Sequence, residues 1–208
     1  MCGCAKQTYN YEGKDLIDKA AEIHTGFESA WVTIYSDELT DKQSIVYRFE
    51  GEVMQYMYSA HIDGKTYYEF NNGTELNYIT LPDETEWSFT AKGSEDYYSY
   101  SKASRHYFAD GSQLFTDYEA AVSGSEITEI DGSINIKLSY DLEKLSQYSA
   151  FAGYEFTDFS MEFFIAKENG RCLVFSNEYT LADGTSHSYQ VTMLEKDANE
   201  PIERIEIE

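Results

Sequence analysis

Apolar and polar residues alternate most regularly between Glu155 and Glu195, and this pattern predicts three strands joined by two short loops. A period of two is typical of a sheet with one covered face. The first segment carries four such apolar positions: Phe159, Met161, Phe163 and Ile165. Gly170 and Gly184 end the predicted three-residue loops, because glycine adopts the left-handed conformation needed there at no steric cost.

The register of this meander follows from matching apolar residues across neighbouring strands. A slip of one residue would turn every side chain to the other face of the sheet. The predicted pairs are Phe163 with Phe175, Phe159 with Tyr179, Ile165 with Leu173, Phe175 with Val191, and Leu173 with Met193.

This register places Asn177 on the apolar face, between Met161 and Tyr189. A buried amide must find hydrogen-bond partners or cost about 1–3 kcal/mol. Two interpretations stay open. Asn177 bonds a tyrosine hydroxyl or lies near an edge, or it is a polar group inside a cavity.

Shorter patterns on either side predict further strands and hairpins. Ser29–Ser36 reads as a strand, and apolar matching favours three-residue loops at 62–64 and 71–73, with Tyr58 facing Tyr68 and Tyr68 facing Leu76. At Asp131-Gly132 a two-residue turn is favoured, because it places Ile127 opposite Ile136. A last strand is expected from Pro201 onward.

Two helical regions are also expected. Leu16, Ala20, Ile23 and Phe27 recur at helical spacing, which predicts a helix over 15–27 that Asp15 caps. Residues 103–109 and 112–122 are predicted to form a short helical insertion.

Together these elements predict an α+β, mainly β fold. We expect a large curved antiparallel sheet of about 10–12 strands, forming an unclosed half-barrel. The N-terminal helix and the helical insertion would cover its concave face. Residues 1–13 are expected to be a lipobox remnant and flexible tether, and residues 14–208 a single curved-sheet domain.

Composition limits the classes of partner. The 208 residues include 15 Lys or Arg and 38 Asp or Glu, for a net charge of −23. Nucleic-acid binding needs a positive surface, so it is not expected. The same charge opposes direct docking on anionic lipid surfaces. With 42% hydrophobic residues, the chain can bury a core.

The first four residues, Met-Cys-Gly-Cys, resemble the end of a bacterial lipobox. In that match Gly3 precedes the cleavage point and Cys4 is the lipid anchor; the alternative is a chance Gly-Cys pair. No run of about 18 apolar residues marks a membrane span. We therefore expect an extracytoplasmic lipoprotein of the bacterial cell envelope that contacts the membrane through this anchor only.

Catalytic and metal-binding patterns are missing from the sequence. There is no Gly-x-Ser-x-Gly elbow, and the four histidines (24, 61, 106 and 187) do not pair at helical spacing. The glycines close hairpins instead of cradling phosphate. We expect no enzymatic activity, no catalytic residue, no metal site and no cofactor.

The order of elements resembles the LolA/LppX-like group of bacterial lipoproteins. The resemblance rests on Gly3-Cys4, the predicted N-terminal helix, the run IDGKTYYEFNNGTELNY and the run IAKENGRCLVFSNEYTLADGTSHSYQVTMLE. It implies a lipid-tethered curved sheet that carries lipid or lipoprotein acyl chains in its hollow. This chain has fewer aliphatic and more Tyr residues than we expect of an acyl-chain carrier.

Two functional hypotheses follow from these observations. In the first, an exported lipid-anchored protein binds a lipid or other hydrophobic small molecule in the hollow. The contacting residues would be Phe159, Met161, Phe163, Phe175, Asn177, Tyr179, Tyr189 and Val191. In the second, the protein is a non-enzymatic surface scaffold or interaction lipoprotein, and the hollow is a filled core.

Overall fold

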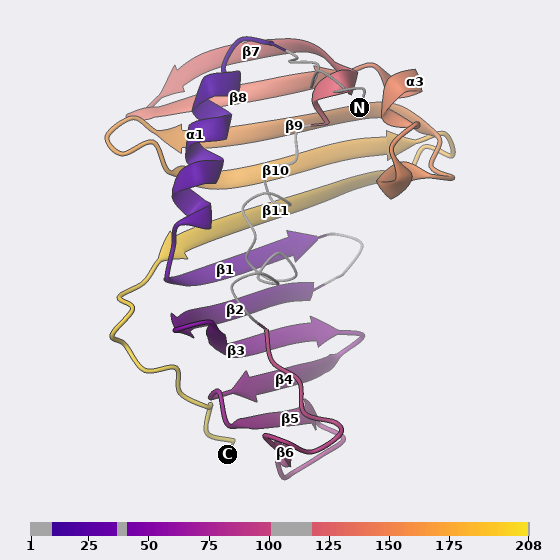
Figure 1. Ribbon diagram of the computed structural model, residues 1–208. Coiled ribbons are helices and arrows are strands. Elements are labelled where there is room, and N and C mark those ends of the chain that lie inside the picture. The colour runs from indigo at the N-terminus through magenta and orange to yellow at the C-terminus, as the bar shows by residue number, and fades with distance from the viewer. Residues whose placement is uncertain (1–9, 37–40, 101–117, 208) are drawn as a thin grey trace, which may run out of the picture.

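A computed structural model describes residues 10–36, 41–100 and 118–207 and shows one open antiparallel sheet (Figure 1). The strand order is β6-β5-β4-β3-β2-β1-β11-β10-β9-β8-β7, so the two ends of the sheet do not pair with each other. The strands are β1 (Ser29–Ser36), β2 (Asp41–Glu50), β3 (Val53–Ile62), β4 (Lys65–Asn71), β5 (Glu75–Leu81), β6 (Ser88–Ala91), β7 (Val122–Ile130), β8 (Ser133–Tyr140), β9 (Phe156–Ala166), β10 (Cys172–Leu181) and β11 (Ser186–Glu195). The helical elements are α1 (Lys14–Thr25), η2 (Glu119–Ala121), α3 (Leu142–Leu145) and η3 (Ser149–Phe151). The predicted mainly β, unclosed architecture is confirmed.

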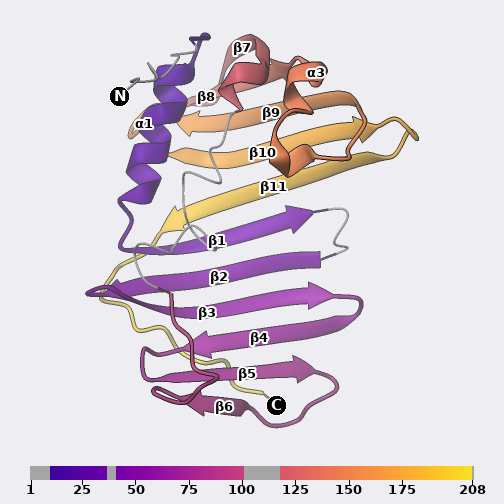
Figure 2. The same ribbon diagram turned by 45° about the vertical axis from the view of Figure 1, so that its right-hand side comes forward.

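Two meanders make up the sheet, and one pairing joins them. Strands β1 to β6 follow one another in space, as do β7 to β11. The first and last strands of the chain, β1 and β11, then pair with each other. Figure 2 shows α1 crossing the strands of the second meander on one face, which we call the inner face. The opposite face is the outer face.

The predicted meander at 155–195 is confirmed as β9, β10 and β11. Phe163 faces Phe175, Phe159 faces Tyr179 and Phe175 faces Val191. The loop at 182–184 has three residues, and Gly184 closes it with φ +87°. In β7 and β8, Ile127 faces Ile136 as expected.

A β-bulge at Leu173 corrects the prediction for the start of β10. Ile165 pairs with Cys172, not Leu173, and the register shifts between Cys172 and Val174. Cys172 is therefore buried on the inner face, whereas Leu173 is 41% exposed and does not face Met193. The predicted three-residue loop at 168–170 is therefore wrong: the Ala166 N–H donates to the Arg171 carbonyl (2.8 Å), which leaves a loop of four residues, 167–170. The bulge offsets this extra loop residue and restores the predicted register beyond it.

The predicted three-residue loops at 62–64 and 71–73 are wrong. Asp63 and Gly64 form a two-residue turn with φ +52° and +75°, so Ile62 pairs with Lys65. Aspartate tolerates the left-handed conformation that such a turn requires at both positions. Tyr58 consequently faces Glu69 instead of Tyr68.

The second correction follows from the same meander. Tyr68 faces Ile79 instead of Leu76, and Leu76 faces Asn71. The two faces of β4 are therefore exchanged relative to the prediction. The side chains of Glu69 and Asn71 lie on the inner face.

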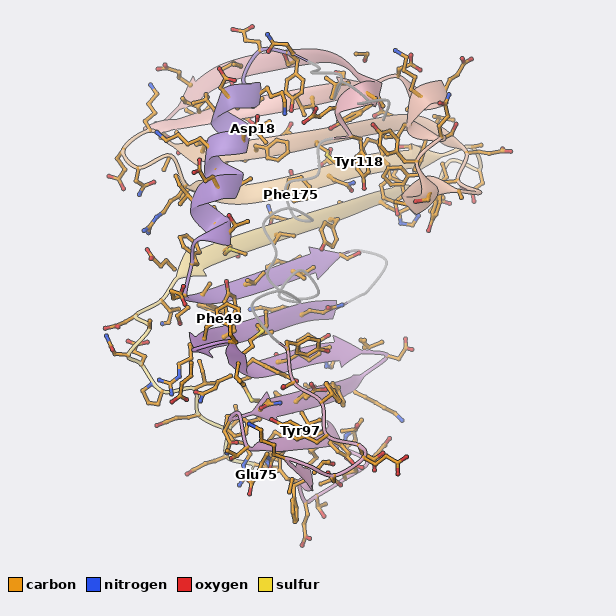
Figure 3. All side chains as sticks on the ribbon, viewed as in Figure 1. Asp18, Phe49, Glu75, Tyr97, Tyr118 and Phe175 are labelled. Atoms are coloured by element: carbon orange, nitrogen blue, oxygen red, sulfur yellow. The ribbon has the colours of Figure 1, made fainter. Side chains whose placement is uncertain are left out.

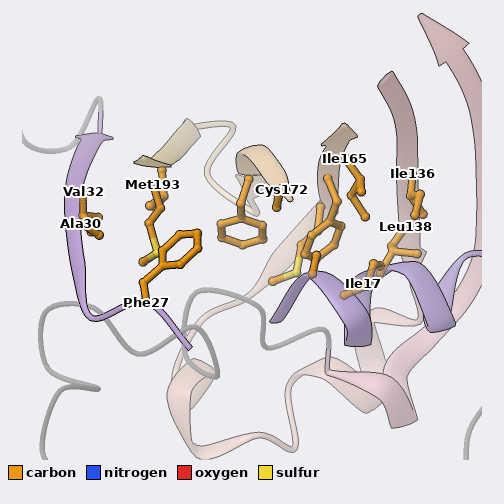
Figure 4. Packing of buried hydrophobic residues seen from close by; sticks show 14 of the residues in the cluster. Ile17, Phe27, Ala30, Val32, Ile136, Leu138, Ile165, Cys172 and Met193 are labelled. Carbon is orange, nitrogen blue, oxygen red and sulfur yellow. The ribbon is translucent and has the colours of Figure 1, made fainter. Parts of the chain in front are cut away.

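Helix α1 buries a different stripe from the one predicted. Ile17, Ala20 and His24 face the sheet, whereas Leu16 and Ile23 are only partly buried. Gly13 precedes the helix with φ +89° and supplies no side-chain cap, so Asp15 lies inside the first turn. A Cβ on Gly13 would lie 3.0 Å from the Ile136 side chain, and this close approach fixes the start of the helix. Figure 4 shows Ile17 directed at the inner-face residues of the second meander.

The last described residues, 201–207, form no strand. Ile202, Ile205 and Ile207 do not keep a strict period of two. This segment instead lies along the outer face of the first meander, where Arg204 Nη1 donates to Asn77 Oδ1 (3.1 Å). Its guanidinium also lies 5.3 Å from the centre of the Trp87 ring.

Several predictions fall outside the described residues. Cys4 and most of the tether lie in 1–9, and most of the helical insertion lies in 101–117. At the described end of the insertion, Glu119–Ala121 forms the short helix η2, but Val122 already begins β7. No helix in the described part of the chain is long and apolar enough to cross a membrane.

Candidate functional site

All eight predicted ligand-binding residues lie on the inner face of the second meander. Cross-strand pairs bring them together from three adjacent strands. They are Phe159, Met161 and Phe163 on β9, Phe175, Asn177 and Tyr179 on β10, and Tyr189 and Val191 on β11.

Five of the eight are part of the hydrophobic core. Phe159, Met161, Phe163, Phe175 and Val191 are each at most 6% exposed. The rings of Phe163 and Phe175 lie 5.1 Å apart, centre to centre. These residues therefore form a packed floor.

Tyr179 belongs to an aromatic cluster at the far end of the strands from α1. Its ring lies 5.5 Å from Phe156 and 5.0 Å from His187. Phe151 of η3 contacts Phe156, and Tyr118 contacts Phe151 with ring centres 4.7 Å apart. Figure 3 shows Tyr118 and Phe175 over the same meander. The short helical pieces cover this end of the inner face, and α1 covers the other.

Asn177 lies between these two covers. It faces Met161 on one side and Tyr189 on the other, as predicted. Its Oδ1 is shielded from solvent and, within the described structure, accepts no hydrogen bond. Burial also raises the pKa of the neighbouring Tyr189 phenol. The expectation that Asn177 bonds a tyrosine hydroxyl is therefore not met at this oxygen.

His24 anchors α1 to the sheet through its ring nitrogens. The Cys172 backbone N–H donates to Nε2 (3.1 Å), so the neutral ring carries its hydrogen on Nδ1, 2.9 Å from Met193 Sδ. Burial, followed by the positive charge of Arg171, lowers the pKa of His24 to about 4.

Cys172 lies beside His24 and is buried. Its thiol donates to the Val174 carbonyl (3.1 Å), and burial raises its pKa to about 12. A thiol held in this protonated form is a poor nucleophile.

Glu69 is the centre of a buried polar network on the inner face of the first meander. It is 6% exposed and accepts hydrogen bonds from the phenols of Tyr56, Tyr67 and Tyr98, the last two at 2.6 Å. Among the described residues, no Lys or Arg forms an ion pair with it. Three charge-assisted hydrogen bonds from phenols stabilise the carboxylate.

The phenols respond to the same environment. Burial, with further contributions from the charge and hydrogen bond of Glu69, raises the pKa of Tyr56, Tyr67 and Tyr98. Asn71 Nδ2 also donates to the Tyr98 carbonyl (3.1 Å), and the Met54 N–H donates to the Tyr100 carbonyl (2.8 Å). The network thus fastens residues 98–100 across the inner face.

Sequence reasoning missed this network because the predicted loop at 62–64 turned Glu69 outward. The signal that could have revealed it is Asp63-Gly64, a dipeptide typical of two-residue hairpin turns.

A hollow of about 540 Å³ lies on the outer face, and Asn177 and Tyr189 also contribute to its lining. It is lined by polar and aromatic side chains, including Tyr35, Glu162, Phe164, Ser176, Glu178 and Gln190. Lys137 forms an ion pair with Glu162 (3.2 Å) at its border. This polar lining does not suit a hydrophobic ligand.

Within the described ranges, no group of three or more His, Cys, Asp or Glu side chains could hold a metal ion.

Comparison with known proteins gives a distant structural likeness. No protein-family model matches the chain, and no curated protein matches it in sequence. Among solved structures, the chain is similar to the crystal structure of MucB in complex with MucA(peri), at 12% identity and a TM-score of 0.41 over 90% of this chain and 58% of that one. It is also similar to the Pseudomonas aeruginosa MucA/MucB complex, at 8% identity and a TM-score of 0.38 over 86% of this chain and 56% of that one. The chain thus spans less than two thirds of these proteins, and the likeness is too distant to assign a function.

Acid should destabilise the protein through His24. The neutral ring is favoured in the folded state, whereas an unfolded histidine titrates near its usual pKa of about 6.5. The free energy of unfolding should therefore fall as pH drops from about 6.5 towards 4, by up to about 3 kcal/mol. Chemical denaturation across this pH range measures the loss.

Substitution of His24 by Gln should flatten this part of the pH profile, because Gln does not titrate. The control is His61→Gln, which changes an exposed histidine on β3 and should keep the wild-type slope. If both variants show the wild-type slope, His24 is not the group responsible.

Removal of the Glu69 carboxylate should destabilise the first meander. Glu69→Leu leaves three phenol donors without their acceptor, and we expect a loss of about 3 kcal/mol or more. Tyr98→Phe removes a single donor and should cost about 1 kcal/mol. Denaturant titration measures both changes. Tyr78→Phe is the control. Tyr78 on β5 pairs with Glu69 on β4 but is exposed, so this substitution should change stability little. An unaffected Glu69→Leu variant would contradict the role of the network.

Proposed function

We propose that the protein is an exported, lipid-anchored binding protein that holds a hydrophobic ligand on the inner face of its half-barrel. The observation that carries this proposal is a group of half-buried residues between the two helical covers and at the edge of the aromatic cluster. We name it the inner patch: Ile34, Asn177, Tyr179 and Tyr189. Ligand sites in proteins are mostly apolar surfaces with a few placed polar groups, and this patch has that composition.

The burial pattern narrows the residues that would contact a ligand. Phe159, Met161, Phe163, Phe175 and Val191 are shielded and would support the site from below. Asn177, Tyr179 and Tyr189 are half-buried and would touch the ligand. Tyrosine rings offer a large apolar surface with a polar end, so they suit a lipid or another hydrophobic small molecule.

The main alternative is a non-enzymatic scaffold or protein-interaction lipoprotein. The observation that favours it is the packed floor, because five of the eight predicted contact residues are already filled core. In that case the inner patch is the rim of a core, and the protein carries no ligand.

Mass spectrometry of natively purified protein separates these two functions. We expect a hydrophobic molecule to co-purify with the wild type from the bacterial envelope. Tyr189→Asp should abolish its retention, because the new charge would have to be desolvated against the ligand.

The matched control is Ser188→Asp, which places the same charge one residue earlier in β11 on an exposed side chain and should leave retention unchanged. Circular dichroism of both variants checks that they fold. A wild-type protein that carries no hydrophobic molecule would favour the scaffold function.

The proposed anchor is Cys4, and fatty-acid labelling of the full-length protein in bacterial cells tests it. We expect label on the wild type and none on Cys4→Ala. Cys2→Ala is the control and should retain the label, because only Cys4 follows Gly3 in the lipobox pattern. Label that survives in Cys4→Ala would refute the anchor without affecting the proposed ligand site.

A further inference from the structure

The unpaired oxygen of Asn177 gives information about the chemistry of a ligand. Oδ1 is shielded from solvent and accepts no hydrogen bond among the described residues. Asn71, a buried asparagine on the inner face of β4, shows the usual arrangement. Its Oδ1 accepts from the Gly73 N–H (2.7 Å) and its Nδ2 donates to the Tyr98 carbonyl (3.1 Å).

An unpaired buried acceptor is rare in folded proteins, and each case calls for a physical reason. The oxygen of Asn177 has already lost its contact with water in the free protein. A ligand that displaces the protein atoms covering this oxygen and brings a donor to it gains a hydrogen bond, with no water to remove from the oxygen itself. A ligand that brings only apolar or acceptor atoms leaves it unpaired.

The surroundings of Asn177 favour a neutral donor. Met161 and Tyr189 face it across the neighbouring strands, and Phe175 and Tyr179 flank it along β10. None of these four side chains carries a positive charge that could compensate a buried anion. The net charge of −23 further opposes an anionic ligand.

We infer that the inner patch selects a ligand with an apolar body and a neutral hydrogen-bond donor, a hydroxyl or an amide N–H, that donates to Asn177 Oδ1. Long-chain alcohols, acylglycerols and fatty amides belong to this class, whereas fatty-acid anions do not. This inference rests on the proposed binding function and adds the class of head group.

Matched probes test the inference directly. The first probe is a long-chain primary alcohol, and the second is the methyl ether of the same chain, which lacks the donor. We expect the wild type to bind the alcohol about tenfold more tightly than the ether, since one hydrogen bond is recovered. Competition against a fluorescent lipid measures both affinities. The corresponding fatty-acid anion should bind more weakly than the alcohol.

Variants of two asparagines show where the preference arises. Asn177→Leu should bind both probes with similar affinity, and Asn177→Asp, which keeps an acceptor, should retain the preference for the alcohol. Asn135→Leu is a matched control. Asn135 also has a shielded, unpaired Oδ1 in the same sheet, but it faces Phe164 on the outer face. It should behave like the wild type.

The outcomes separate the two proposals. If the wild type binds alcohol and ether equally, or Asn177→Leu keeps the preference, the head-group inference is wrong while the binding function stands. If the wild type binds neither probe, the proposed binding function fails, and the inference fails with it. The wild-type comparison alone decides the inference if Asn177→Leu does not fold.

Discussion

The pairing of β1 with β11 is the constraint on which the rest of the structure depends. Every other strand pairs only with neighbours in sequence, so each meander could form its own hairpins locally. The β1–β11 ladder alone joins residues near both ends of the described chain, with Val32 facing Met193 and Ile34 facing Val191. Such a contact carries the largest loop-closure cost in the sheet. Burial of these apolar side chains offsets that cost.

The same pairing positions α1. The helix ends at Thr25 and β1 begins at Ser29, so the short connection leaves the helix little freedom once β1 has joined the sheet. α1 therefore lies across the second meander, where His24 contacts Met193 and Cys172. The first meander has no helix of its own among the described residues. Its inner face is closed by residues 98–100, which the Glu69 network holds. The inner faces of the two meanders are thus covered by different elements.

Apolar matching across strands predicted the register where the buried face is apolar. It succeeded for Phe163 with Phe175 and for Ile127 with Ile136. It failed at β4, where the buried face carries Glu69 and Asn71 and the outward face carries the aromatic residues expected inside. In that case turn chemistry at Asp63-Gly64 was the better guide. The prediction of the buried face of α1 failed for a related reason, because one of the buried residues is a histidine.

For the candidate site, too, the sequence predicted some features and not others. Register alone placed Asn177 on the apolar face, so its position was predictable. The shielding of its oxygen depends on the packing of distant elements, which no local pattern encodes. A leucine of similar size at this position would avoid the cost of an unpaired amide in a core. If the inner patch were only core, Asn177 would therefore oppose folding with no compensating gain. We propose that a bound ligand completes the hydrogen bond of this polar group on an otherwise apolar face.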